Sequence, residues 1–145
     1  HEATVLATRA QQGESGNVSM GILAERILTP YRHGNNIEID IDDAVVATQG
    51  KVNDYAMIFH ELATNSAKYG ALSGGGTLKV QGQMAADGMH VTWRERSAPS
   101  EVPKADGTGF GSRLLKQTIE RSLGGRFERA IDGKGLCFAM VIPQT

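Results

Sequence analysis

The sequence predicts an α+β domain in which a mixed sheet is covered on one face by about three helices, a two-layer α/β sandwich. Three observations support this fold class. With 145 residues and 40% hydrophobic content, the chain can form one domain with a real core and is too short for two comfortable ones. Helical and strand periodicities occupy separate segments. The strand segments in the second half are paired around short turns, as in hairpins.

The N-terminal half is expected to contain three helices and a strand. Apolar residues recur at helical spacing over residues 2–12, and a second helix is predicted from Met20 to about Tyr31, capped by the segment 17–19. The segment 36–41 alternates apolar and polar residues, which is typical of a half-buried strand, and 44–47 is a weaker candidate. A central helix is predicted over 53–69, where Gly70 supplies a stop.

The second half is expected to form two hairpins around one further helix. After a glycine-rich loop at 73–76, strands are predicted at 77–81 and 89–93, and later at 126–131 and 136–142. Residues 97–109 lack periodicity and are expected to form a loop that leads into a helix from Ser112 to Leu123. The last strand is almost wholly apolar, which predicts a central place in the sheet.

Composition excludes several classes of protein. Fifteen basic against sixteen acidic residues give a formal charge of −1, so no global charge favours binding to nucleic acid or to an anionic membrane. The apolar runs are too short for membrane insertion, and we expect a cytoplasmic location. The single cysteine, Cys137, lies in an apolar run and is expected to be a buried core thiol.

The central helix carries polar residues whose chemistry suits a phosphorylated ligand. Glu61, Asn65 and Lys68 are spaced at i, i+4 and i+7, so they project from one face of the helix. An amide oxygen can bind Mg²⁺, a carboxylate can orient water or accept a proton, and an ammonium can contact phosphate. An ordinary amphipathic helix could also carry such residues, but this trio outlines a nucleotide site.

Two further segments could complete that site. Gly107, Gly109 and Gly111 stand in alternate positions before a predicted helix, where backbone N–H groups can approach an anion. A flexible linker is the alternative for this segment; a dinucleotide-binding turn is disfavoured because no apolar strand precedes it. The strand around Trp93 ends on Glu95, which is either solvated or an acceptor for the amino group of adenine.

In this order, the segments resemble the ATP-binding domain of the superfamily of histidine kinases, gyrase, Hsp90 and mismatch-repair ATPases, which has the Bergerat fold. Within it the chain is similar to the HWE sensor histidine kinases, named for a His in the helical motif and a Trp-x-Glu triplet. Here these residues are His60, Trp93 and Glu95. The resemblance covers about residues 36–145.

The resemblance implies ATP and Mg²⁺ as ligands. It implies that Asn65 holds Mg²⁺, helped by Glu61, that Lys68 contacts phosphate, that Tyr69 packs on the nucleoside, and that Glu95 reads adenine. It also implies a glycine motif that closes over the phosphates: Gly107, Gly109, Phe110, Gly111 and Ser112.

Three residues depart from the family pattern. Ser97 and Ala98 stand where glycines are usual, and Leu136 stands where a Thr is usual. These departures put in question the close backbone approach to the base and a hydroxyl contact beside it.

By the same resemblance, residues 35–145 are expected to form the catalytic domain of a bacterial two-component kinase. Residues 1–34 would be a remnant of, or connector to, an upstream dimerisation hairpin. The γ-phosphoryl would pass to a histidine on that hairpin, and a sensor domain and a response regulator would be further partners. His60 is not expected to be the acceptor, and His33 and His90 are expected at the surface. The alternatives are a degenerate, non-catalytic docking module and an anti-sigma-type protein-serine kinase.

Overall fold

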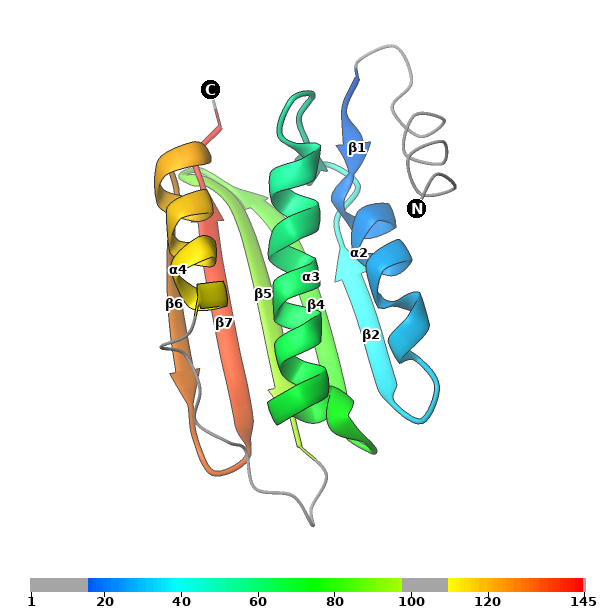
Figure 1. Ribbon diagram of the computed structural model, residues 1–145. Coiled ribbons are helices and arrows are strands. Elements are labelled where there is room, and N and C mark those ends of the chain that lie inside the picture. The colour runs from blue at the N-terminus through cyan, green and yellow to red at the C-terminus, as the bar shows by residue number, and fades with distance from the viewer. Residues whose placement is uncertain (1–15, 98–109, 145) are drawn as a thin grey trace.

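The computed structural model describes residues 16–97 and 110–144, except for the side chains of 110–112. A five-stranded mixed sheet has helices on one face (Figure 1). This confirms the predicted α+β class. The strands follow the order β2-β4-β5-β7-β6, with β2 parallel to β4 and the other neighbours antiparallel. Their bounds are β2 Asn36–Ile41, β4 Thr77–Ala85, β5 Gly88–Arg96, β6 Arg126–Ile131 and β7 Gly135–Ile142.

Helices α2 (Met20–Leu28), α3 (Val52–Tyr69) and α4 (Phe110–Gln117) lie on the same face of the sheet (Figure 1). The cap predicted for α2 is confirmed, since the hydroxyl of Ser19 accepts a hydrogen bond from the N–H of Ile22 at 3.3 Å. Short 3₁₀ turns, η1 (Thr29–Tyr31) and η2 (Ala71–Ser73), follow the first two helices. The helix expected at residues 2–12 lies outside the described residues.

Helix α4 differs from the prediction at both ends. It begins two residues before Ser112 and passes at Thr118 into a turn of π-helix, η3 (Thr118–Ser122). This last turn is tied to the start of α3, because Lys51 Nζ donates to the Ser122 carbonyl at 3.0 Å and the Ser122 hydroxyl donates to Asp54 at 2.6 Å.

The weak strand predicted at 44–47 is shorter than expected and does not join the main sheet. β3 (Val46–Ala47) instead pairs with β1 (Val18–Ser19), just before α2. The pairing joins segments almost thirty residues apart, so no local sequence pattern predicts it. Val18 and Ala47 are both buried in the core.

One hydrophobic core joins α2, α3, α4 and the covered face of the sheet. Trp93 on β5 is fully buried and stacks on Phe59 of α3, with ring centroids 6.4 Å apart. Because α2 contributes Met20 and Leu28 to this core, it packs as part of the same folded unit as residues 36–142. The domain boundary expected near residue 34 stays a prediction.

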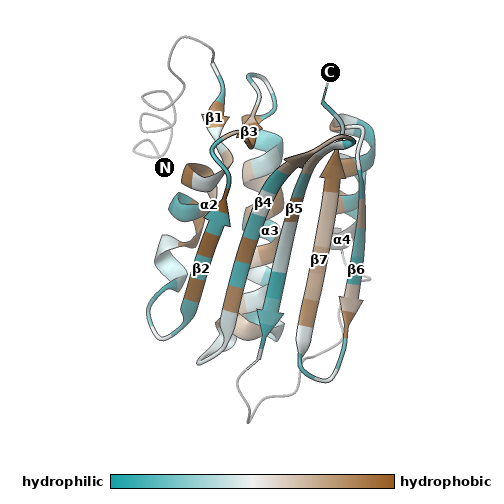
Figure 2. Cartoon of the chain, turned by 180° about the vertical axis from the view of Figure 1, so that it is seen from behind, coloured by the Kyte–Doolittle hydropathy of each residue, from teal (hydrophilic) through white to brown (hydrophobic). Residues whose placement is uncertain are grey.

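The opposite face of the sheet is not covered by any described helix (Figure 2). Cys137 points to this side and is partly exposed, so the expectation of a buried core thiol is wrong. In the register, Phe138 faces Trp93 whereas Cys137 faces Arg94, an exposed residue. β7 is nevertheless an interior strand, since it pairs with both β5 and β6.

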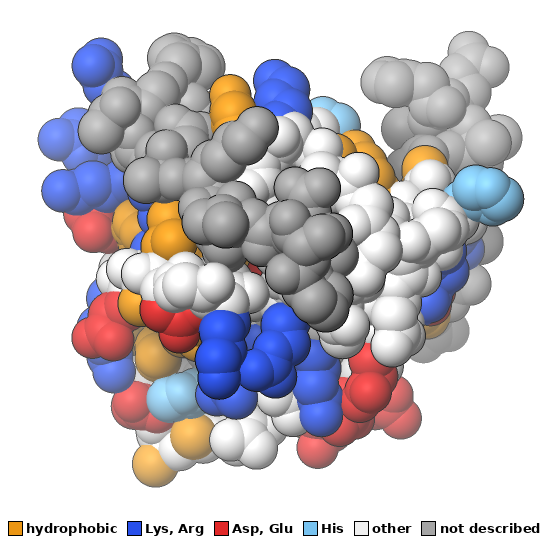
Figure 3. Space-filling model, turned by 90° about the horizontal axis from the view of Figure 1, so that it is seen from below, with side chains coloured by type: hydrophobic (Ala, Val, Ile, Leu, Met, Phe, Trp, Pro, Cys, Tyr) orange, Lys and Arg blue, Asp and Glu red, His pale blue; other side chains and the backbone are white. Residues whose placement is uncertain are grey.

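Basic side chains gather at one end of this uncovered face, as the view from below shows (Figure 3). A shallow depression there is lined by Lys79, Arg94, Arg96 and Lys134. Lys79 forms an ion pair with Glu38 at 3.4 Å. His33 is exposed, as predicted, while His90 is half-buried and bonded to Asp87 at 2.6 Å.

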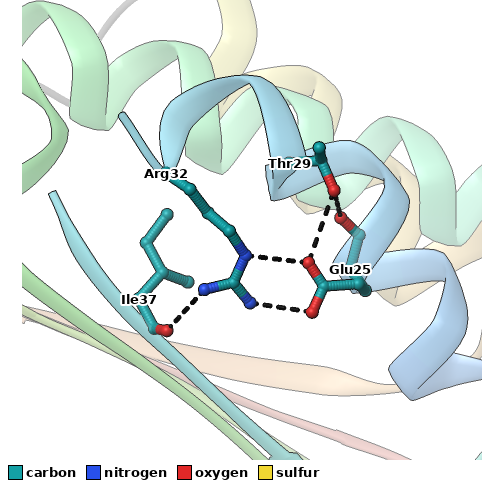
Figure 4. Close-up of polar contacts among 4 residues, drawn as sticks. All are labelled: Glu25, Thr29, Arg32 and Ile37. Carbon is teal, nitrogen blue, oxygen red and sulfur yellow. Dashed lines mark hydrogen bonds and ion pairs between the residues drawn. The ribbon is translucent and has the colours of Figure 1, made fainter. Parts of the chain in front are cut away.

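An arginine links α2 to the edge strand β2 (Figure 4). Arg32 donates two hydrogen bonds to the carboxylate of Glu25, at 2.9 and 2.7 Å, and a third to the carbonyl of Ile37 at 2.8 Å. The hydrogen bond from Arg32 lowers the pKa of Glu25 below its ordinary value. The two-pronged contact fixes the turn between α2 and β2.

Candidate functional site

A pocket opens between the C-terminal half of α3 and the neighbouring ends of β5, β6 and β7. Its empty space, counting the part open to solvent, is about 540 Å³. Its wall combines apolar side chains with a few polar ones: Leu62, Asn65, Ser66, Tyr69, Gly70, Glu95, Ser97, Leu115, Arg129, Ile131, Gly135 and Leu136.

Glu95 is the buried acid of this pocket. It is 7% exposed, and described residues donate three hydrogen bonds to its carboxylate. Oε1 accepts from the Ser66 hydroxyl at 2.7 Å and from the Ala71 N–H at 3.1 Å, while Oε2 accepts from the indole Nε1 of Trp93 at 2.7 Å. Burying a carboxylate is costly unless such donors surround it. These contacts therefore hold it in one orientation.

The Trp-x-Glu spacing has a direct physical basis here. Trp93 and Glu95 are two residues apart on β5, so both side chains point to the covered face of the sheet. The indole is fully buried, and its only N–H is satisfied by the carboxylate. The tryptophan both packs in the core and orients the acid.

Two glycines make room for Glu95. A Cβ on Gly70 would lie 2.2 Å from Oε1 of Glu95, and a Cβ on Gly135 would lie 1.8 Å from the Glu95 carbonyl oxygen. A side chain at Gly70 would collide with the carboxylate, and one at Gly135 would collide with the backbone of β5. Both positions exclude every residue larger than glycine unless their neighbours move.

The structure places only part of the predicted site around the pocket. Asn65 and Tyr69 line it, Asn65 half-buried and Tyr69 39% exposed. Lys68 is exposed on the same helix, and Glu61 is half-buried one turn before Asn65. His60 is exposed and does not line the pocket. Roles for these residues stay predictions.

The residues that depart from the family pattern also lie here. Leu136 faces Glu95 across the β5–β7 ladder and lines the pocket together with Ser97. Gly107, Gly109 and Ala98 lie outside the described residues. Phe110, Gly111 and Ser112 form the first turn of α4.

Ser66 is one of the pocket residues that the sequence did not predict. It is a polar side chain with only 2% exposure on the buried face of α3, four residues after Leu62. A polar residue in an otherwise apolar helical stripe needs a hydrogen-bond partner, and that signal could have singled it out. Leu115, Arg129 and Ile131 were also missed, because α4 and β6 reach the pocket only through the tertiary fold.

The polar residues of α3 suit a magnesium ion that is carried by a nucleotide. In the described part of the chain, no three His, Cys, Asp or Glu side chains are placed to hold a metal. Mg²⁺ commonly keeps several waters and takes only one or two protein ligands beside phosphate oxygens. The Asn65 amide at the pocket wall, with the Glu61 carboxylate one turn away, provides that kind of donor set.

The fold is that of a histidine-kinase catalytic domain. The histidine kinase domain of the blue-light-activated kinase EL346 from Erythrobacter litoralis superimposes with a TM-score of 0.73 and 16% identity, covering 97% of this chain and 71% of that one. The catalytic domain of histidine kinase ThkA gives a TM-score of 0.71 and 14% identity, covering 89% and 96%.

Sequence relatives agree with the fold. A blue-light-activated histidine kinase of Rhizobium johnstonii is 29% identical over 145 residues, which are 98% of this chain and 40% of the relative. One of Brucella ovis is 33% identical over 95 residues, 62% of this chain and 19% of the relative. The chain thus spans less than half the length of these relatives. No family model matches it. The predicted resemblance to histidine-kinase catalytic domains is confirmed.

Within the described part of the chain, every helix is too short or too polar to cross a lipid bilayer.

Proposed function

We propose that this chain binds Mg·ATP and serves as the catalytic domain of a sensor histidine kinase. The observation that carries the proposal is the state of Glu95 in the pocket. Both acceptor positions of Oε1 are used, whereas Oε2 accepts only the Trp93 indole among the described residues. One acceptor position is left for a ligand, and an exocyclic amino group such as that of adenine fits it.

The rest of the pocket fits a nucleotide bound in this orientation. Apolar walls from Leu62, Leu115 and Leu136 can cover the faces of a base. Asn65 lies one helical turn before Tyr69 on α3, and both line the pocket. The phosphates and their metal would be held beside the Asn65 side-chain amide. Lys68, on the exposed side of α3, can extend to a phosphate oxygen.

Phosphoryl transfer asks mainly for positioning and for neutralisation of charge. When bound, Mg²⁺ would supply the larger share of that neutralisation, and Lys68 would add a cation. Glu61 would orient water or the incoming imidazole. The acceptor histidine, the sensor domain and the response regulator would belong to a longer protein or to separate partners. Among the described histidines, His60 and His33 are exposed, and neither is proposed as the acceptor.

The acceptor distinguishes this function from its rivals. The chain, joined to the dimerisation segment of its parent protein, is incubated with ATP labelled at the γ-phosphate. We expect the label on protein to be lost in acid and kept in base, as phosphohistidine is. Acid-stable label would indicate a serine kinase, and absence of label would favour a docking module; either result would contradict the proposal. No observation on the described residues favours these rivals.

A further inference from the structure

Ser66 connects three parts of the pocket through one hydroxyl group. Its Oγ donates to Glu95 Oε1 at 2.7 Å and accepts from the N–H of Leu72 at 3.0 Å. Ser66 lies near the end of α3, Leu72 in the η2 turn and Glu95 at the end of β5. The hydroxyl is therefore fully used as a donor and is enclosed at 2% exposure.

This connection decides which part of the carboxylate faces a ligand. Ser66 and the Ala71 N–H occupy Oε1, so this oxygen points toward the helix end and the η2 turn. The carboxylate plane then sets Oε2 against the Trp93 indole, and no other described residue donates to this oxygen. Gly70 packs so closely that a Cβ there would touch Oε1, which leaves the group little space to turn.

We infer that Ser66 is a positioning residue that sets the purine selectivity of the pocket by fixing the orientation of Glu95. This inference rests on the proposed function, since it assumes that the pocket takes a purine nucleotide. A fixed acceptor favours a base with an amino group at the purine 6-position. It disfavours a base with a 6-carbonyl, because two acceptor oxygens would then face each other without a proton between them.

Removing the Ser66 hydroxyl should weaken the preference for a 6-amino purine over a 6-carbonyl purine. In Ser66→Ala, Oε1 keeps only the Ala71 N–H, and the Leu72 N–H loses its acceptor. The carboxylate can then rotate or admit water, so a 6-carbonyl is penalised less. A single hydrogen bond of this kind changes affinity by about three- to tenfold, and we expect the ratio of ATP to ITP affinity to fall by that factor.

The test compares Mg·ATP with Mg·ITP, which differ in the group at the purine 6-position and in the proton that ITP carries on the adjacent N1. Both are titrated calorimetrically into the unmutated chain, Ser66→Ala and Ser73→Ala. Ser73 is the matched control, because it lies in the adjacent η2 turn but is exposed, and among the described residues its hydroxyl bonds only the Gly70 carbonyl. Ser66→Cys, which keeps the side-chain size but offers a weak donor, is the second variant and should lower the ratio in the same direction.

A spectroscopic measurement reports on the same contact without nucleotide. The chain has one tryptophan, so its indole N–H gives a single side-chain NMR signal. We expect Ser66→Ala to shift that signal, because the oxygen it binds would move, and Ser73→Ala to leave it in place. A purely structural role for Ser66 would lower stability without changing selectivity.

The outcomes separate this inference from the proposed function. If the unmutated chain prefers ATP and Ser66→Ala keeps the same preference and the same indole signal, the positioning role is wrong while the nucleotide site stands. An equal loss of affinity for both nucleotides in Ser66→Ala would also contradict the positioning role. If the unmutated chain binds neither nucleotide, the proposed function fails and takes the inference with it.

Discussion

Replacing Glu95 with alanine is expected to lower the free energy of unfolding by about 3 kcal/mol and to abolish binding of adenine nucleotides. The substitution removes the acceptor from the Ser66 hydroxyl, the Ala71 N–H and the Trp93 indole at once. Leaving one buried donor unsatisfied costs about 1–3 kcal/mol, and water entering the enlarged pocket offsets part of the sum. The same change deletes the group that would accept the adenine amino group.

Denaturant unfolding followed by the fluorescence of the single tryptophan measures the loss of stability, and nucleotide titration measures the loss of binding. Glu128→Ala is the control, because Glu128 is exposed on the edge strand β6 of the same sheet. We expect it to change stability by less than about 0.5 kcal/mol. If Glu95→Ala were as mild as this control, the carboxylate would not be the anchor of the pocket.

Gly135→Ala is the second substitution with a large expected effect, about 3 kcal/mol of lost stability. The new Cβ would lie 1.8 Å from the Glu95 carbonyl oxygen and 2.7 Å from its carbonyl carbon. Both atoms belong to the backbone of β5, so no side-chain rotation relieves the contact. The β5–β7 ladder would have to separate at the pocket.

Gly133→Ala, two residues earlier in the turn that leads into β7, provides a matched comparison. A Cβ at Gly133 meets no atom within 4 Å, and substitution by alanine reduces the freedom of the unfolded chain. We expect this variant to be neutral or slightly stabilised. Thermal unfolding of both variants measures the difference, and equal melting temperatures would show that β5 and β7 are not in close contact at this point.

Local patterns predicted much of this fold from the sequence. The strand at 36–41 was predicted with its observed bounds, because one of its faces is buried and the alternation of residues records that burial. The prediction for α3 began one residue late and ended at the observed position, since Gly70 ends the helix. In both segments, burial on one face coincides with the periodicity of the backbone.

The predictions were wrong where tertiary structure determines the length of a strand or the burial of a side chain. β4 extends further than predicted, through Gln83 and Met84, because its pairing with β5 continues where the residues themselves show no strand pattern. Cys137 was assigned to the core from its apolar neighbours, but one face of the sheet is uncovered. An apolar run does not reveal whether both faces of a strand are packed.

The candidate site was predicted in part for the same reason. The side chain of Asn65 predicts metal binding, and that of Glu95 predicts a hydrogen bond to a nucleotide base. The structure places both residues at one pocket. Ser66 differs, because a serine beside Asn65 has many possible partners. Only the fold brings its hydroxyl to Glu95, across 29 residues of sequence.

The proposed function depends first on binding of Mg·ATP by the chain itself. We expect calorimetric titration with a non-hydrolysable ATP analogue to show saturable binding that requires Mg²⁺. Asn65→Ala should abolish that binding, and Asn53→Ala, at an exposed position on the same helix, should preserve it. Absence of binding by the unmutated chain, or equal binding by Asn65→Ala, would contradict the proposed function.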